Sequence, residues 1–255
     1  MAELQALIFD VDGTLAETEE VHRAAFNRAF EEQRLGWLWD RALYKRLLDV
    51  TGGKERLRYW LEGPFAAPGR DEMLARADLG EWIAAMHKRK TALYTEMIDA
   101  RAVDLRPGVA TLIDAAREAG VRLAISTTTS LPNIESLLAA TLGTTWRDVF
   151  PVIAAGDQVK AKKPAPDVFL LALERLGLPA DACMALEDSE NGIHSAQAAG
   201  LGVVITTSVY TADQVFPGAL TVVGALDELA GSRRGTADEG AGILAAMRDL
   251  KLRAA

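Results

Sequence analysis

The sequence has few of the features that mark secreted, membrane or nucleic-acid-binding proteins. It contains a single cysteine, Cys183, so an intrachain disulfide cannot form, and the apolar neighbours favour a buried, inert thiol over a nucleophile. No apolar run approaches the roughly 20 residues that span a bilayer, and the N-terminus lacks a basic region followed by an apolar core. The net charge of −8 argues against general binding of nucleic-acid phosphates. We therefore expect a cytoplasmic monomer that binds neither membranes nor nucleic acid.

Two patterns of secondary structure divide the 255 residues. After an opening apolar strand, helix-forming residues continue from about Val21 to Asp99, which is longer than an ordinary loop. From Leu105 onward, helical segments alternate with short apolar strands, a pattern typical of a Rossmann-like parallel sheet with helices on both faces. We predict an α/β core at 1–16 and 101–230, an inserted helical cap at 17–100, and a linker followed by a terminal helix or a mobile tail at 231–255. Thr18 is expected to be the N-cap of the first helix.

The opening strand ends in Asp10-Val11-Asp12-Gly13-Thr14. Side chains two residues apart on an extended chain point the same way, so Asp10 and Asp12 can face one site. Two carboxylates this close need a cation or a shared proton to coexist. An ordinary turn at Asp12-Gly13 is the alternative interpretation.

Polar side chains also follow later strands of the predicted sheet. Ser126 and Thr127 follow the strand at 121–125, Glu187 and Asp188 follow the strand at 183–186, and Lys163 precedes a helix. In parallel sheets, ligands bind outside the carboxyl ends of the strands. Hard oxygen ligands suit Mg²⁺, and no cluster of histidines and cysteines offers a zinc site. This set of groups suits phosphoryl transfer.

Two breaks in the helical insert are candidates for anion binding. The segment 50–56 combines a glycine pair with Thr51, Lys54 and Arg56, whose amides could form an anion-binding concavity or simply a turn between helices. The run His87-Lys88-Arg89-Lys90 could bind an anion or form a solvated helix face.

Four motifs resemble the signatures of the haloacid-dehalogenase-like phosphohydrolases. They are Asp10-Val11-Asp12-Gly13-Thr14, the Ser/Thr after the second strand, Lys163-Pro164 and Glu187-Asp188. Further segments are similar to the helical-capped CbbY-type phosphatases, which act on xylulose 1,5-bisphosphate, an inhibitory by-product of Rubisco in the Calvin cycle; these segments are 16–19, 51–56, 127–133 and 154–157. The resemblance covers about residues 4 to 228.

The resemblance implies separate roles for the core residues. Asp10 would be the nucleophile that forms an aspartyl-phosphate, and Asp12 would protonate the leaving oxygen and then activate water. Mg²⁺ would be bound by Asp10, by Asp188 and by the backbone carbonyl of Asp12, with Glu187 reaching it through water. Lys163 would offset the negative charge. Thr127 would donate to a phosphoryl oxygen.

The resemblance also implies a small phosphorylated sugar as substrate. The candidate substrate-binding residues are Glu17, His22, Thr51, Gly52, Gly53, Lys54, Arg56, His87, Lys90, Thr128, Thr129, Ser130 and Asn133. An equal alternative is that His22 is a structural histidine of a helix, with its ring nitrogens hydrogen-bonded within the protein. Two other functions stay open, a sugar phosphomutase of the β-phosphoglucomutase type and a phosphosugar-binding module without turnover.

Overall fold

A six-stranded parallel sheet forms the centre of the protein, which we describe from a computed structural model over residues 3–100 and 103–253. The strand order is β3-β2-β1-β4-β5-β6, and every neighbouring pair is parallel. The strands are β1 (Ala6–Phe9), β2 (Arg122–Ser126), β3 (Val152–Ala154), β4 (Cys183–Glu187), β5 (Gly202–Thr206) and β6 (Thr221–Val223). The predicted α/β fold is confirmed.

The alternating side chains of β1 explain why both faces of the sheet are covered. Leu7 and Phe9 pack into one apolar cluster with α6 (Val109–Glu118), α7 (Leu131–Leu142) and α8 (Trp146–Val149). Ala6 and Ile8 pack into a second cluster with α9 (Asp167–Leu176) and α10 (Glu190–Ala198). All four residues of β1 are buried, which is why a strand covered on both faces is apolar at every position. Cys183 is also buried, as expected.

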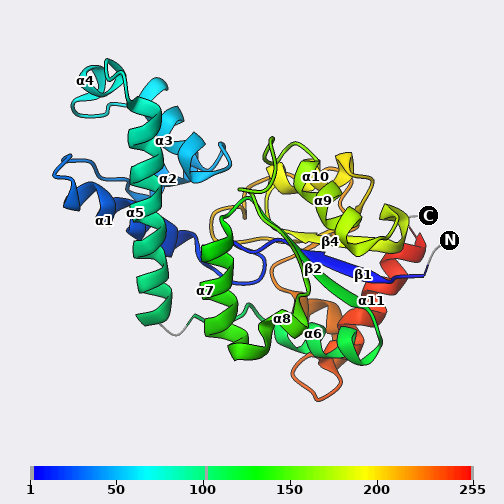
Figure 1. Cartoon of the computed structure of the whole chain (residues 1–255). Helices are drawn as coiled ribbons and strands as arrows, with labels where there is room; N and C mark the ends of the chain where they lie inside the picture. The colour runs from blue at the N-terminus through cyan, green and yellow to red at the C-terminus, as the bar shows by residue number, and fades with distance from the viewer. Residues whose placement is uncertain (1–2, 101–102, 254–255) are drawn as a thin grey trace.

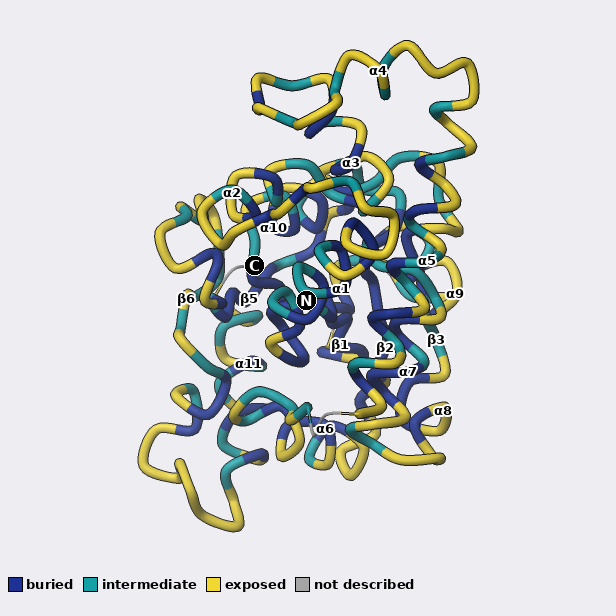
Figure 2. The backbone as a smooth tube through the Cα atoms, turned by 90° about the vertical axis from the view of Figure 1, so that its left-hand side faces the viewer, coloured by how far each residue is buried: buried dark blue, intermediate teal, exposed yellow. Residues whose placement is uncertain are grey.

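Of the helices that the described residues form between β1 and β2, all but α6 form a separate layer beyond the sheet (Figure 1). They are α1 (Glu19–Glu32), α2 (Arg41–Leu47), α3 (Gly53–Glu62), α4 (Arg70–Leu74) and α5 (Leu79–Ala100). Their centre is aromatic, with Trp37, Trp39 and Trp60 packed around Phe30. α4 and the turns beside it are largely exposed, whereas the strands are buried (Figure 2). We propose that these five helices are the cap. The predicted boundary at residue 101, where the chain returns to the core, lies outside the described residues.

The C-terminal region contains α11 (Glu239–Arg253), which packs against α6 and against the 3-10 helix Leu226–Arg233. Ile243, Leu244 and Met247 are buried in this contact. Gly240 lies so close to α6 that an added Cβ would be 2.0 Å from the carbonyl oxygen of Thr111. α11 therefore packs on the core, whereas residues 231–238 are exposed. Residues 1–2 and 254–255, which the predicted boundaries include, lie outside the described part. Two more 3-10 helices occupy Gly143–Thr145 and Ala180–Ala182.

None of the helices within the described ranges is long and apolar enough to cross a membrane.

Candidate active site

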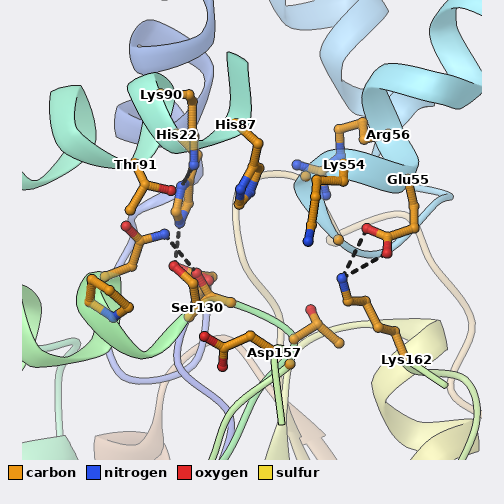
Figure 3. Close-up of a pocket in the computed structure, with 18 of the residues that line it drawn as sticks. His22, Lys54, Glu55, Arg56, His87, Lys90, Thr91, Ser130, Asp157 and Lys162 are labelled. Carbon is orange, nitrogen blue, oxygen red and sulfur yellow. Dashed lines mark hydrogen bonds and ion pairs between the residues drawn. The ribbon is translucent and has the colours of Figure 1, made fainter. Parts of the chain in front are cut away.

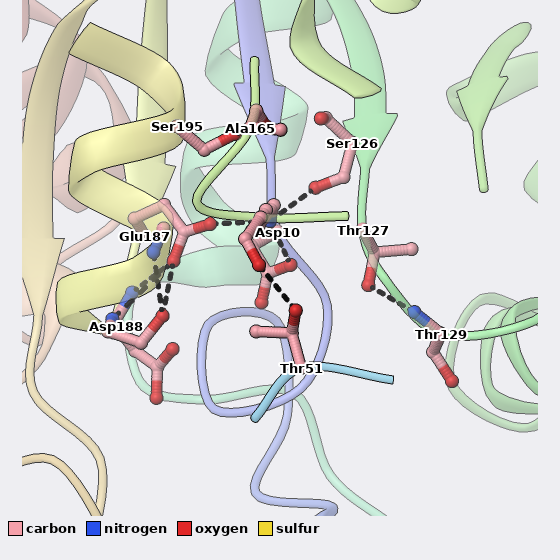
Figure 4. Close-up of polar contacts among 12 residues, drawn as sticks. Asp10, Thr51, Ser126, Thr127, Thr129, Ala165, Glu187, Asp188 and Ser195 are labelled. Atoms are coloured by element: carbon pink, nitrogen blue, oxygen red, sulfur yellow. Dashed lines mark hydrogen bonds and ion pairs between the residues drawn. The ribbon is translucent and has the colours of Figure 1, made fainter. Parts of the chain in front are cut away.

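The carboxylates of Asp10 and Glu187 lie at the carboxyl ends of β1 and β4 (Figure 4), and Lys163 contacts both of them. Its Nζ is 2.7 Å from Oδ1 of Asp10 and 2.5 Å from Oε1 of Glu187, and it donates to the carbonyl of Ser126 at 2.9 Å. All of these charged groups are buried. Burial disfavours the ammonium, but the two carboxylates outweigh that effect and raise the pKa of Lys163. The lysine therefore stays charged.

The carboxylates of Asp10, Glu187 and Asp188 form a buried acidic cluster. One oxygen of each lies within 4.8 Å of the others. Burial raises the pKa of Asp10 to about 7 against the attraction of Lys163, and burial together with Glu187 and Asp10 raises the pKa of Asp188. Crowded acids with raised pKa values are what a divalent cation relieves, and an all-oxygen donor set suits a hard cation. These residues therefore fit a metal of this kind.

The carboxylate of Asp12 is held by residues of the cap. Its Oδ1 accepts a 2.5 Å hydrogen bond from the Thr18 hydroxyl and lies 2.9 Å from Nε2 of His22. Nδ1 of His22 in turn contacts the ammonium of Lys90 on α5. Burial opposes ionisation of Asp12, but His22, Thr18 and Lys90 together lower its pKa to about 2. Burial lowers the pKa of Lys90 to about 7.

The prediction that Thr18 is the N-cap of the first helix is confirmed for its position, but the hydrogen bond that a capping side chain usually makes is absent. Thr18 stands at the N-cap position of α1, but its side chain accepts no backbone N–H. Its backbone has φ −107° and ψ −9°, close to helical, whereas a capping residue is usually extended. The hydroxyl is thereby free to donate to Asp12.

A small cavity contains both aspartates of the first motif. Asp10, Asp12, Thr127, Lys163 and Asp188 all line it. Thr127 accepts a hydrogen bond from the backbone N–H of Thr129 at 3.3 Å, which leaves its hydroxyl proton available to a ligand (Figure 4). The structure thus brings together the residues that the core motifs single out.

A larger cavity of about 410 Å³ lies between the cap and the core (Figure 3). Helices α1, α3 and α5 contribute its upper wall, and the lower wall comes from the loop before α7 with the first turn of α7 (128–133) and from the loop at 156–162. The predicted substrate-binding residues along it are His22, Gly52, Gly53, Lys54, Arg56, His87, Lys90, Thr128, Thr129, Ser130 and Asn133. Thr51 instead lines the small cavity.

Glu17 is a predicted substrate-binding residue that the structure does not bring to either cavity. Its carboxylate is 3.4 Å from Nε of Arg106, whose guanidinium also donates to the carbonyls of Thr207 and Gly224 at 2.7 Å. Arg106 draws the Glu17 side chain away from the cavities. Arg106 lies 89 positions later in the chain, and nothing in the sequence indicated the pair.

Arg56 makes two hydrogen bonds within the cap, although it borders both cavities. Its guanidinium donates to the Tyr44 hydroxyl at 2.9 Å and to the carbonyl of Leu47 at 3.2 Å, and it lies over the Tyr44 ring. This buried arginine therefore joins α2 to α3. Within the basic run of α5, Arg89 faces away from the cavity and pairs with Glu32 at 2.7 Å.

Hydrogen-bonding atoms without partners lie along one side of the larger cavity. Within the described residues, Thr91 Oγ1, Ser130 Oγ and Asn133 Oδ1 are buried and make no hydrogen bond. Unpaired buried polar atoms are rare in folded proteins, so these groups point to a polar ligand. Ser130 and Asn133 lie at the N-terminus of α7, where the helix dipole favours an anion.

Several residues of the larger cavity are not among the predicted substrate-binding residues. Lys88, Lys160, Lys162, Glu55, Thr91 and Asp157 also line the larger cavity. Lys162 had a usable signal, because it adjoins Lys163 in the third motif. His87 lies among these cations; burial first, and then Lys90, Lys54 and Lys162, lower its pKa to about 3. The His87 ring is therefore neutral at pH 7.

A sequence model described as haloacid dehalogenase-like hydrolase matches residues 4–200. The protein CbbY of Rhodobacter capsulatus is 53% identical over 217 residues, which is 85% of this chain and 91% of that protein. A crystal structure of mutant CbbY from Rhodobacter sphaeroides, in complex with xylulose-(1,5)bisphosphate, has a TM-score of 0.82 and 45% identity, covering 89% of this chain and 96% of that one. The β-phosphoglucomutase of Clostridium difficile shares the fold, with a TM-score of 0.70 at 23% identity, covering 89% of this chain and 93% of that chain.

Proposed function

This chain belongs to the haloacid dehalogenase-like hydrolase family, and on that premise we propose that it is a Mg²⁺-dependent phosphatase that removes the 1-phosphate of xylulose 1,5-bisphosphate. The observation that carries the proposal is the division of labour between two aspartates. Asp10 contacts Lys163 within the acidic cluster, whereas Asp12 contacts His22 of the cap. Two carboxylates in such different environments suit a nucleophile and an acid/base.

In the proposed reaction, an Asp10 oxygen attacks phosphorus and the sugar oxygen leaves with a proton from Asp12. Water then attacks the aspartyl-phosphate while Asp12 takes up a proton. Bound by Asp10, Asp188 and the Asp12 carbonyl, with Glu187 through water, Mg²⁺ would screen the negative charges. Lys163 holds Asp10 in place, and Thr127 donates to a phosphoryl oxygen. Asp12 is ionised beside His22, so it has to gain a proton before it can act as the acid. That proton has to come from the hydrogen-bonded network of His22 and Lys90 when substrate binds.

The larger cavity supports a bisphosphate as substrate. A second phosphate needs cations and hydrogen-bond donors away from the acidic cluster. Lys54 extends into the cavity from α3, and Ser130 marks the N-terminus of α7 across from it (Figure 3). We assign the distal phosphate to this part of the cavity, together with His87, Lys90 and Thr129. The proposal includes a cytoplasmic, monomeric enzyme that removes an inhibitor of Rubisco in the Calvin cycle.

Phosphate release from a panel of sugar mono- and bisphosphates tests the proposal. We expect Mg²⁺-dependent release that is fastest with xylulose 1,5-bisphosphate and slower with ribulose 1,5-bisphosphate. Asp10→Asn should abolish release while the circular dichroism spectrum stays unchanged. Isomerisation of a sugar phosphate without net release would instead indicate a phosphomutase. Binding of the sugar with no turnover would indicate a phosphosugar-binding module.

A further inference from the structure

The cap contacts the core at the residue pair Lys162 and Lys163. Both carboxylate oxygens of Glu55, on α3, lie 2.9 Å from Nζ of Lys162 (Figure 3). The hydroxyl of Thr51, in the turn before α3, donates to the backbone carbonyl of Lys163 (Figure 4). One turn of the cap therefore contacts the side chain of one lysine and the backbone of the next.

Gly52 brings this turn close enough for both contacts. A Cβ at Gly52 would lie 2.7 Å from Cδ and 2.8 Å from Nζ of Lys162, and 2.4 Å from Oε2 of Glu55. The φ of +89° at Gly52 is also one that other residues rarely adopt. The Glu55–Lys162 ion pair thus crosses directly over the glycine, and the cap turn is packed against the core segment.

The same core segment carries the ammonium that contacts the reacting carboxylate. Lys163 Nζ is 2.7 Å from Asp10 Oδ1. Thr51 contacts the backbone carbonyl of this same lysine. A displacement of the cap turn would therefore move the backbone of Lys163, and with it the side chain that contacts Asp10. The Lys162 side chain is 17% exposed and that of Glu55 is 45% exposed, so this ion pair borders the cavity and can open.

We propose that Thr51 and Glu55 are positioning residues that couple closure of the cap to the placement of Lys163 on Asp10. The proposal rests on the proposed function, since it assigns Asp10 the nucleophilic step. Closure of the cap would set the Lys162-Lys163 segment, and Lys163 would then hold the Asp10 carboxylate in line for attack. Neither residue needs to contact the substrate for this effect.

Two substrates separate positioning from substrate binding. Xylulose 1,5-bisphosphate reaches the larger cavity, whereas p-nitrophenyl phosphate carries no second phosphate. We expect Thr51→Val and Glu55→Gln each to lower kcat about tenfold with both substrates, because small displacements of reacting groups are costly, while KM changes less than about twofold. Thr51→Ser, which keeps the hydroxyl, should retain wild-type kcat.

A charge exchange and a matched control complete the test. Combining Glu55→Lys with Lys162→Glu should recover most of the kcat that either change alone removes. Lys45→Met breaks another cap–core ion pair, between Lys45 and Asp213 at 2.6 Å, which is distant in sequence from the Lys162-Lys163 segment. Its kcat should stay within about twofold of wild type, because exposed pairs contribute little.

Three results would overturn the inference while leaving the proposed function intact. They are wild-type kcat in Thr51→Val and Glu55→Gln, a loss confined to KM for the bisphosphate, and an equal loss of kcat in Lys45→Met. Thermal unfolding of each variant checks that a fall in kcat is not a loss of folded protein. Absence of phosphate release from every substrate by the wild-type protein would overturn the proposed function itself, and this inference with it.

Discussion

Nε2 of His22 lies 2.9 Å from Oδ1 of Asp12, so a cap residue is in direct contact with the second aspartate of the first motif. The imidazole is stacked on the ring of Tyr94, with ring centroids 4.1 Å apart, and its other nitrogen contacts Lys90. His22 is in α1, whereas Tyr94 and Lys90 are in α5. The environment of Asp12 therefore depends on two cap helices.

His22→Gln should impair both stability and turnover. The pKa of Asp12 is about 2 in the folded protein, below its ordinary 3.8, so its ionised form stabilises the fold above pH 4, and that contribution is lost as pH falls towards 2. Removing His22 leaves the largely buried carboxylate of Asp12 short of a partner, at a cost on the order of 1–3 kcal/mol. We expect a lower urea midpoint at pH 7 and a smaller kcat. Arg28→Gln, which removes a pair between side chains 54% and 70% exposed, should barely move the midpoint.

Stabilisation of the protein by Mg²⁺ should increase with pH. Without metal, the raised pKa values of Asp10, about 7, and of Asp188 mean that the folded protein binds more protons than the unfolded chain between pH 4 and 7. The free energy of unfolding of the metal-free protein therefore falls as pH rises through this window. Mg²⁺ binds the ionised carboxylates, so the rise in Tm on adding Mg²⁺ after EDTA treatment should be larger at pH 8 than at pH 5. Equal rises at both pH values, or the same rise in Asp188→Asn, would contradict the assignment of the site.

Lys54→Ala should reduce affinity for the distal phosphate alone. Lys54 lines the larger cavity, away from the acidic cluster. We expect KM for xylulose 1,5-bisphosphate to rise about tenfold, in keeping with loss of one charge-assisted contact, while KM for p-nitrophenyl phosphate is unchanged. Arg58→Ala is a matched control on the same helix, because Arg58 pairs with Glu62 at 2.8 Å outside the cavity. A similar rise in KM for both variants would point to a general effect of charge.

Gly192→Ala should be destabilising although Gly192 lies in the helix α10. An added Cβ would be 1.9 Å from Cδ of Glu187, so the carboxylate that contacts Lys163 would have to move. We expect a loss of about 1–3 kcal/mol in the free energy of unfolding, as for other overpacked cores, together with a fall in kcat. Gly80 lies in the first turn of α5 with no atom within 4 Å of an added Cβ. Gly80→Ala should stabilise by up to about 1 kcal/mol, and a comparable gain in Gly192→Ala would refute the contact.

Local patterns were sufficient for the sheet and for the groups at its edge. Leu7-Ile8-Phe9 is apolar at every position, which indicates a strand buried on both faces, and Asp10 follows it directly. Because the strands are parallel, their carboxyl ends meet at one edge, so Asp10, Thr127 and Asp188 were expected to be neighbours without any knowledge of distances. The regular alternation of strand and helix carried this information along the chain.

The contacts between cap and core were beyond such patterns. Thr18 is a good capping residue by type, but its backbone conformation directs the hydroxyl to Asp12. Glu17 directly precedes Thr18, but its carboxylate lies beside Arg106 and not beside Asp12. Which partner each of these side chains contacts depends on how the five cap helices pack against the sheet, and no single segment of the sequence determines that packing.

The sequence by itself therefore determined the α/β fold and the chemical groups at the strand ends, since periodicity and order along the chain are local properties. The tertiary structure decided which aspartate contacts Lys163 and which contacts His22, and it placed Thr51 and Glu55 on the Lys162-Lys163 segment. The physical reason is that these pairs join residues from 10 to more than 150 positions apart, so each depends on how separate segments pack together and not on any local pattern.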